Sequence, residues 1–412
     1  YEEIMKKFLL LILLPVICVA FLQADYIYVV NSESRTLSRI DTETGTVNNT
    51  FTQLGLTPNM LKVNTDYIYV VLSGANSIQM IDRHSGTTIR NIFIASSSNP
   101  WDVVENNGYL YVSGMFTNKV YKISQETWTV VDQITVGTAP EGLEVCNGKL
   151  YVCNTGGYAS GYANSSVSVI DLNSFSVIKS IPVWTNPQDL YVFNSQLHIV
   201  CTGNWSSISG AVDIIDSITD ERIDRLLMGG NPWSVWISPQ GIAYLGEGYN
   251  SGVYSYNAST LEILHNSSNP LTPGGIMISG SNDCIAVLYA PWSQNGTVYL
   301  RNHNWQPISQ WTVALLPTDI CYYSNETPIS DEELPLPKIS LYPNPVNKDG
   351  ILNFKIDNAF YKELEVYNLR GQKVLQTNVI KGETSIDLKG KGLHSGIYFY
   401  KSGNVQGKLI IK

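Results

Sequence analysis

The chain has 412 residues, of which 44% are hydrophobic and 15% are charged, and its formal net charge is −9. The apolar fraction argues against a disordered chain, and the length predicts two or three domains. The acidic balance argues against a nucleic-acid partner, which would require a basic surface.

The first 24 residues have the pattern of a secretory signal peptide. Lys6-Lys7 is a basic start, and Phe8–Ala20 is an apolar run too short to span a bilayer comfortably. Small residues follow at Ala20 and Ala24, which predicts cleavage after one of them. No later segment is long and apolar enough to be a transmembrane helix, so we expect none in the mature chain.

A repeat begins directly after this leader. Two landmarks recur, a proline that opens a short apolar run and a polar residue that closes another. The prolines are 40 to 47 residues apart and lie at Pro58, Pro100, Pro140, Pro187, Pro232, Pro273 and Pro317. The closing residues are Asp41, Asp82, Ser124, Asp171, Asp216, Asn257 and Asn302. Seven units of this period, each with four strand-like runs, predict an all-β fold, a seven-bladed β-propeller over residues 25–324.

The order of the runs predicts how the ring closes. The repeat region starts in a second run, Asp25–Asn31, and ends in a first run, Leu316–Tyr323. We therefore expect these two runs to pair, because the pairing would complete the first blade and remove a free sheet edge. The turns after the first and third runs are short, whereas the other loops are longer and variable. Antiparallel order places all the longer loops on one face.

Units such as GKLYVCN followed by SVSVIDLNSFSVIKSIPVWTNPQDLYV resemble the YVTN-type, or surface-layer-type, seven-bladed propellers. The resemblance covers about residues 25–324 and implies the fold. It does not imply one activity, since this superfamily contains binding proteins, lactonases, lyases and cofactor oxidases.

A polar, acidic and proline-rich linker is expected at residues 325–337, before a different pattern at residues 338–412. The runs of this tail predict a small antiparallel β-sandwich. Four motifs of this tail resemble the C-terminal sorting domain of the type IX secretion system. They are Tyr342-Pro343-Asn344-Pro345, Val366–Gly371 (VYNLRG), Ser395–Tyr398 (SGIY) and Lys408–Lys412. The resemblance implies that residues 338–412 engage the export machinery of the outer membrane. The protein would then be secreted or held at the outer surface of a Gram-negative bacterium, with the domain removed and lipopolysaccharide frequently the anchor. The alternative is a generic β-sandwich that binds some other molecule.

Two sets of residues receive structural interpretations. Asp41, Asp82, Asp171 and Asp216 each precede a tight turn, where an Asp side chain accepts bonds from backbone N–H groups, so we expect turn caps. The cysteines after the leader are Cys146, Cys153, Cys201, Cys284 and Cys321. Their number is odd and no metal or haem spacing is present, so we expect small core residues rather than disulfides.

Three carboxylates are candidate metal ligands. Asp102, Asp189 and Asp319 each follow a repeat proline by two residues, and Glu141 follows its proline by one. If the first runs line a central channel, these side chains surround one channel mouth and could hold Ca²⁺ or Mg²⁺. The alternative is that each one caps its own turn.

Aromatic residues of the longer loops indicate a binding face. The expected ligand-binding residues are Trp101, Glu141, Asp189 and Trp233, bordered by Trp205 and Trp292. Rings beside a few carboxylates favour a glycan, a peptide or a small polar ligand over a phosphate. The alternative is that the rings pack between neighbouring loops.

Two functions follow from these patterns. The first is a secreted, surface-displayed binding protein without catalytic activity, since no catalytic constellation is recognisable. The second is a metal-dependent propeller lactonase, hydrolase or lyase that acts at the channel mouth.

Overall fold

The computed structural model describes residues 25–324, 339–356, 363–378, 382–402 and 405–412. The chain divides into two compact units, Tyr1–Asn325 and Glu326–Lys412. The expected signal peptide and linker lie outside the described residues. Within the described ranges, no helix has the length and apolar character needed to cross a membrane.

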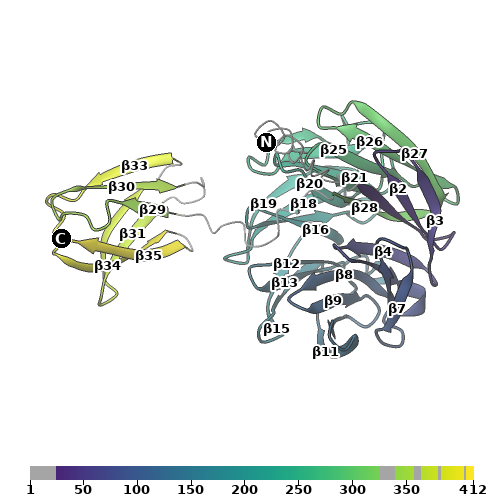
Figure 1. Ribbon diagram of the computed structural model, residues 1–412, viewed down its shortest axis with the longest axis horizontal. Helices are drawn as coiled ribbons and strands as arrows, with labels where there is room; N and C mark the ends of the chain where they lie inside the picture. The colour runs from purple at the N-terminus through teal and green to yellow at the C-terminus, as the bar shows by residue number, and fades with distance from the viewer. Residues whose placement is uncertain (1–24, 325–338, 357–362, 379–381, 403–404) are drawn as a thin grey trace, which may run out of the picture. The chain divides into compact units, whose positions relative to one another are not determined.

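Residues 25–324 form seven four-stranded antiparallel sheets, called sheets 1 to 7 (Figure 1). In each sheet the strands are named first to fourth in the order in which they pair. Sheet 1 contains β28 (Pro317–Tyr323), β1 (Tyr26–Asn31), β2 (Thr36–Asp41) and β3 (Val47–Gln53). Sheet 2 contains β4 (Pro58–Val63), β5 (Tyr67–Leu72), β6 (Ser77–Asp82) and β7 (Thr88–Phe93). Sheet 3 contains β8 (Pro100–Asn106), β9 (Tyr109–Gly114), β10 (Lys119–Ser124) and β11 (Thr129–Thr135).

The remaining sheets of this unit follow the same order. Sheet 4 contains β12 (Pro140–Cys146), β13 (Lys149–Asn154), β14 (Ser166–Asp171) and β15 (Ser176–Pro182). Sheet 5 contains β16 (Pro187–Phe193), β17 (Gln196–Cys201), β18 (Ala211–Asp216) and β19 (Glu221–Leu227). Sheet 6 contains β20 (Pro232–Ile237), β21 (Ile242–Glu247), β22 (Val253–Asn257) and β23 (Ile263–His265). Sheet 7 contains β24 (Met277–Gly280), β25 (Cys284–Tyr289), β26 (Asn295–Asn302) and β27 (Pro307–Leu315). Two short 3-10 turns, η1 (Ser73–Ala75) and η2 (Tyr158–Ser160), lie between strands.

The last strand of the unit pairs with the first one in sequence. β28 runs antiparallel to β1 with Tyr26 opposite Tyr323 and Val30 opposite Asp319, as the order of the repeats predicted. The first strands also contact one another in succession: β4 with β8, β8 with β12, β12 with β16, β16 with β20, β20 with β24, β24 with β28, and β28 with β4. This all-β arrangement of four-stranded sheets is consistent with a β-propeller.

The sequence landmarks have clear structural roles. Prolines open six of the seven first strands, where a missing N–H group removes no ladder hydrogen bond. The exception is Pro273, because β24 begins only at Met277. Gly274 and Gly275 intervene at a close backbone approach, where a Cβ on Gly274 would lie 2.2 Å from the Asn250 carbonyl oxygen.

Burial is greatest in the second and third strands and least in the fourth. In β5, every residue from Ile68 to Leu72 is buried, which matches its continuous apolar sequence. In β7, by contrast, Ile92 alone is buried. Neighbouring sheets share apolar clusters, such as the one that joins Tyr69 and Ile78 of sheet 2 to Val103 of sheet 3. The core is therefore a series of layers between adjacent sheets.

The second unit contains two sheets around one core, as expected from the sequence. The three-stranded sheet contains β29 (Ile339–Tyr342), β30 (Ile351–Ile356) and β33 (Gly382–Asp387). The other contains β32 (Lys373–Asn378), β31 (Glu363–Asn368), β34 (Gly396–Ser402) and β35 (Val405–Ile411). Leu352 of the first sheet and Val366 and Leu409 of the second belong to one buried cluster.

Candidate functional site

The seven sheets of the first unit present two different faces. We call the side with the second-to-third and fourth-to-first connections the loop face, and the opposite side the turn face. Contacts at equivalent positions show that consecutive first strands run in the same direction: Asp102 contacts Leu143, Asp189 contacts Val235, and Asp319 contacts Leu61. All connections of one kind therefore lie on one side.

The structure brings some of the expected binding residues together. Trp101, Glu141, Asp189 and Trp233 lie near the starts of the first strands of sheets 3 to 6, at the loop face. Trp205, from the loop of sheet 5, lies 5.7 Å from Trp233 between ring centroids. Trp292, in the loop of sheet 7, is 82% exposed. Trp233 differs from the expectation of an open ring, because it packs against an apolar cluster and is only partly exposed.

Five consecutive sheets each present an aromatic residue from the second-to-third loop. Four of these rings are strongly exposed: Phe116 at 69%, Tyr158 at 80%, Tyr249 at 66% and Trp292 at 82%. Trp205, the fifth, is partly buried. Large exposed rings grouped on one face are characteristic of interaction surfaces.

Contacts between neighbouring loops make this set continuous from sheet 4 to sheet 7. Tyr158 and Tyr162 meet edge to face at 6.0 Å, and the Tyr162 hydroxyl is hydrogen-bonded to the side chain of Trp205. Trp205 in turn meets Tyr249 edge to face at 5.2 Å. The side chain of the next residue, Asn250, bonds to both the N–H and the carbonyl of Ala290 at 2.9 and 3.0 Å, two residues before Trp292.

The loops that carry these rings contain no charged residue. They are residues 115–118, 155–165, 202–210, 248–252 and 290–294, rich in Ser, Asn, Thr and Gly. The fourth-to-first connections, residues 54–57, 94–99, 136–139, 183–186, 228–231, 266–276 and 316, are also free of charge. Glu33 and Arg35 of sheet 1 are the charged residues of the loop face connections. The face therefore offers rings, amides and hydroxyls.

Glu141 lies beneath this face and is 3% exposed. Burial raises the pKa of its carboxyl well above the ordinary value, although a hydrogen bond with Gln188 acts in the opposite direction. Its Oε2 is buried without a protein hydrogen-bond partner. The side-chain amide of Gln188 in turn donates to the side-chain oxygen of Asn186 at 2.7 Å. Glu141 is therefore part of a buried polar cluster between sheets 4 and 5 rather than an open contact of the face.

The three candidate metal ligands instead connect neighbouring sheets. One oxygen of each carboxylate accepts a bond from the next N–H of its own strand, and the other accepts from the following first strand. In the second set of bonds the N–H of Leu143 donates to Asp102, that of Val235 to Asp189 and that of Leu61 to Asp319, at 2.8 to 2.9 Å. Among the described residues, no three His, Cys, Asp or Glu side chains are grouped so that they could hold a metal. The structure thus does not assemble the expected ligand set.

These carboxylates have raised pKa values because burial opposes their charge. Burial raises the pKa of Asp102 to about 6 and that of Asp189 to about 7, although two backbone N–H groups stabilise each anion. The pKa of Asp319 is also well above its ordinary value, for the same reason. Each group is thus held as a structural acceptor in surroundings that weaken its acidity.

A cavity of about 590 Å³ opens on the outer side of the sheet 5 loop. Its walls include Trp184, residues 207–210, residues 227–229 and residues 266–267. The Trp184 ring lies against the guanidinium of Arg225 at 4.6 Å, and its N–H donates to the Ser209 carbonyl at 2.8 Å. None of the six expected binding residues lines this cavity, which sequence reasoning did not identify.

The turn face has a repeated role that sequence reasoning identified only in part. The expected Asp caps are present: Asp41, for example, accepts from the N–H groups of Glu43 and Thr44. What the sequence did not reveal is the residue at the left-handed position of each third-to-fourth turn. Those residues, all at positive φ, are Gly45, Gly86, Trp128, Phe175, Asp220, Leu261 and Trp305. Several meet the tyrosine of the preceding sheet's second strand, as Trp128 meets Tyr69 at 6.4 Å.

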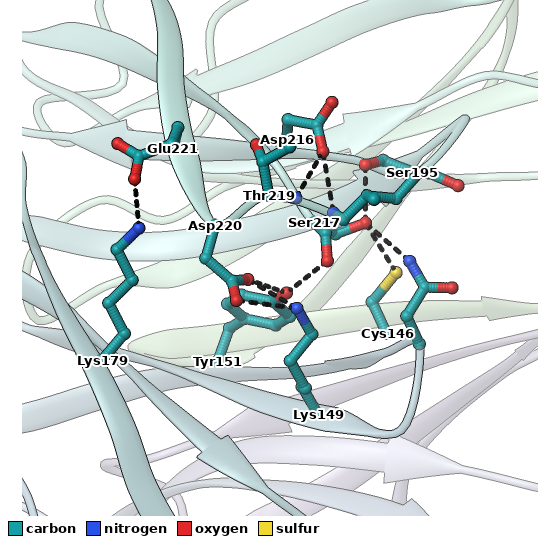
Figure 2. Close-up of polar contacts among 12 residues, drawn as sticks. Cys146, Lys149, Tyr151, Lys179, Ser195, Asp216, Ser217, Thr219, Asp220 and Glu221 are labelled. Atoms are coloured by element: carbon teal, nitrogen blue, oxygen red, sulfur yellow. Dashed lines mark hydrogen bonds and ion pairs between the residues drawn. The ribbon is translucent and has the colours of Figure 1, made fainter. Parts of the chain in front are cut away.

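Between sheets 4 and 5 this contact is polar, as Figure 2 shows. Asp220 accepts from Lys149 at 2.7 Å and from the Tyr151 hydroxyl at 2.7 Å. Burial raises the pKa of Tyr151, and the bond to Asp220 adds to the effect. Nearby, Ser217 donates to the Ser195 carbonyl at 2.6 Å and accepts from the side chains of Asn147 and Cys146. The turn face thus connects adjacent sheets.

The motifs of the tail occupy structural positions in the second unit. The side-chain amide of Asn344 donates to the Lys408 carbonyl at 2.7 Å, and its oxygen accepts from the Ile410 N–H at 2.9 Å. The Asn344 motif is therefore bound to the terminal strand β35. Residues 340–412 match the family described as "Secretion system C-terminal sorting domain". The second unit is a sorting domain of this family.

The sorting domain determines the localisation of the protein. It is a type IX secretion signal and directs export to the cell surface or to the medium. No curated protein matches the chain in a sequence comparison.

Solved structures similar to this chain are propeller-like. "Kuenenia stuttgartiensis Hydrazine Synthase" has a TM-score of 0.53 at 13% identity and covers 64% of this chain and 89% of its own. "Dihydro-heme d1 dehydrogenase NirN in complex with DHE" has a TM-score of 0.51 at 11% identity, with 73% and 75% covered. A functionally unknown protein from Desulfotomaculum acetoxidans DSM 771 has a TM-score of 0.57 at 13% identity, with 73% and 99% covered. These similarities show the fold alone.

Proposed function

We propose that the chain is a surface-displayed binding protein without catalytic activity, whose ligand contacts the loop face of the first unit. The observation that carries this proposal is the continuous contact of loops from sheet 4 to sheet 7, with exposed rings and no charge. Exposed rings contribute much of the binding energy in interfaces and sugar sites. Export to the cell surface places such a face where it meets external ligands.

We also infer that the seven sheets form a seven-bladed propeller closed by β28. The succession of first-strand contacts from β4 to β28 and back to β4 supports a ring. Removal of residues from Leu316 onward would expose the edge of β1 and remove the bond from Leu61 to Asp319. We expect that variant to have a lower melting temperature and to self-associate. An unchanged melting temperature in a monomeric variant would refute ring closure.

The loop-face function is tested by a thermal-shift screen of the full chain with glycans, peptides and small polar compounds. A stabilising compound should lose about 2 kcal/mol of binding free energy when the exposed rings Tyr249 and Trp292 are both replaced by alanine. Ile218→Ala, a 42% exposed side chain in the third-to-fourth turn of sheet 5 on the turn face, is the control. A ligand whose affinity is the same in all three proteins would show that the loop face is not its site.

We further propose that the sorting domain is removed during export in the native host, as in the family it resembles. Intact-mass measurement of surface material should then give a chain that ends before Lys338. A mature exported protein that retains residues 338–412 would contradict this processing step.

A further inference from the structure

The first feature of the loop face that bears on its ligand is its lack of charge in sheets 2 to 7. The whole chain has a formal net charge of −9, yet the connections of sheets 2 to 7 on this face are uncharged. Of the carboxylates beneath this face, Asp102 and Asp189 each accept two backbone N–H bonds, and Glu141 is 3% exposed. Glu247, which ends β21, accepts from the N–H groups of its own loop at Tyr249 and Ser251. A charged ligand would lose hydration here without gaining an opposite charge.

The polar groups that remain suit a polyhydroxylated partner. Ser, Asn and Thr side chains both donate and accept hydrogen bonds, as sugar hydroxyls do. The exposed rings of Tyr158, Tyr249 and Trp292 offer flat apolar surfaces, which pack well against the C–H faces of pyranose rings. Rings beside neutral hydrogen-bonding groups match a carbohydrate, which presents C–H faces and hydroxyls together.

The rings of these loops also form a long row rather than a compact patch. The contacts run through loops of four consecutive sheets, from Tyr158 through Trp205 and Tyr249 to the loop of Trp292. The cavity beside Trp184 lies on the outer side of the same sheet 5 loop and widens the surface there. A single sugar could cover only one part of such a row, whereas a chain of sugars could contact several rings together.

We propose that the ligand is a neutral polysaccharide chain that lies across the loops of sheets 4 to 7. This inference rests on the loop-face binding function proposed above and specifies its ligand class. Each ring contributes a weak contact, and the linkage between sugar units turns the later contacts into intramolecular events, so affinity should grow with chain length.

The test uses β-1,4-linked oligosaccharides of glucose, xylose and mannose, from the monosaccharide to the hexasaccharide, added to the full chain. Titration calorimetry should show at least one series in which the hexasaccharide binds about tenfold or more tightly than the disaccharide. Its affinity should be nearly the same from about 50 mM to about 500 mM salt, because no ion pair forms. Polygalacturonate, an acidic polymer, should bind more weakly than the neutral series.

Variants at the two ends of the row sharpen this test. Tyr158→Ala and Trp292→Ala should each weaken hexasaccharide binding several-fold while disaccharide binding changes little. Ile218→Ala, on the turn face, is the control. Equal affinities for disaccharide and hexasaccharide, sensitive to Tyr249→Ala, would overturn the extended-chain inference but leave the loop-face function standing. Tighter binding of polygalacturonate, or no binding by any neutral series, would overturn the neutral-polysaccharide inference. Glycan binding that none of the ring variants affects would overturn both proposals.

Discussion

The turn face and the loop face of the first unit are made by the same repeat, yet they differ in chemistry. Turns of the turn face contain charged residues in almost every sheet: Glu43, Asp66, Arg83, Glu126, Asp220, Glu262 and Asp283. Two of these are buried: Asp220 pairs with Lys149, and Arg83 donates to the Thr65 carbonyl. On the loop face the connections of sheets 2 to 7 are uncharged, and the loops of sheets 3 to 7 carry aromatic rings. The turn face repeats one structural contact from sheet to sheet, whereas the loop face varies, which is the pattern of a surface adapted to a ligand.

The largest expected effect separates the two faces by stability. Asp220→Ala would leave the largely buried Lys149 ammonium without its carboxylate partner, while the Tyr151 hydroxyl would keep the Ser217 carbonyl as its acceptor (Figure 2). We expect a loss of about 3 kcal/mol in the free energy of unfolding, measured by urea denaturation, with ligand binding at the loop face unchanged.

Glu221→Ala is the matched control for that variant. Glu221 directly follows Asp220 in the chain and forms an ion pair with Lys179, but this pair is much more exposed. Its loss should cost less than about 1 kcal/mol. Equal losses in the two variants would show that the polar contact between sheets 4 and 5 is not a special stabilising element.

A second comparison lies within the loop face. Trp233 packs against an apolar cluster, whereas Trp292 is 82% exposed. Trp233→Ala should therefore lower the free energy of unfolding by about 2 kcal/mol, and Trp292→Ala by less than about 0.5 kcal/mol. Chemical denaturation of both variants checks this difference. If Trp292→Ala is the more destabilised protein, the exposed row is a packing element and not a binding surface.

The last expected effect is the pH dependence due to Asp189. Burial raises its pKa from 3.8 to about 7. The folded protein holds this proton more tightly than the unfolded chain, so the contribution of Asp189 to stability falls as pH rises from about 4 through about 7. A rise of about three in the pKa corresponds to at most about 4 kcal/mol, and the decline should disappear in Asp189→Asn.

Comparison with a variant is necessary because other groups titrate in the same range. Burial lowers the pKa of His198 from 6.5 to about 3, so its contribution is lost as pH falls below 6.5, the opposite direction. Asp171→Asn is the control: backbone and side-chain bonds from Ser174 hold the pKa of Asp171 below its ordinary value. Because Asp171 loses its contribution only below about pH 4, that variant should leave the slope between about pH 4 and about pH 7 nearly unchanged. Equal slopes for wild type and Asp189→Asn would refute the assignment.

The repeat was readable from the sequence because its landmarks are local. Pro58 and its equivalents open first strands, and Asp41 and its equivalents cap turns within three residues, so each signal lies close to its effect. The sorting domain was likewise recognisable from short motifs in a fixed order. The pairing of β28 with β1 followed from the order of the runs alone.

Contacts between sheets were not readable in the same way. Nothing in the sequence places Asp102 against the Leu143 N–H group, because the two belong to different repeats. The carboxylates therefore looked like metal ligands, while in the structure they connect strands. The packing of Trp233 and the burial of Glu141 depend on neighbouring sheets too. The absence of charge on the loop face was visible in the sequence but became meaningful only when the structure assigned each loop to a side.

The most direct test of the central claim is hydrogen–deuterium exchange of the full chain with and without the β-1,4-linked hexasaccharides. The account predicts slower exchange in residues 155–165, 202–210, 248–252 and 290–294, with no change in the turns at 41–46, 124–129 and 216–221. Protection confined to those turns, or spread evenly over both faces, would contradict the assignment of binding to the loop face.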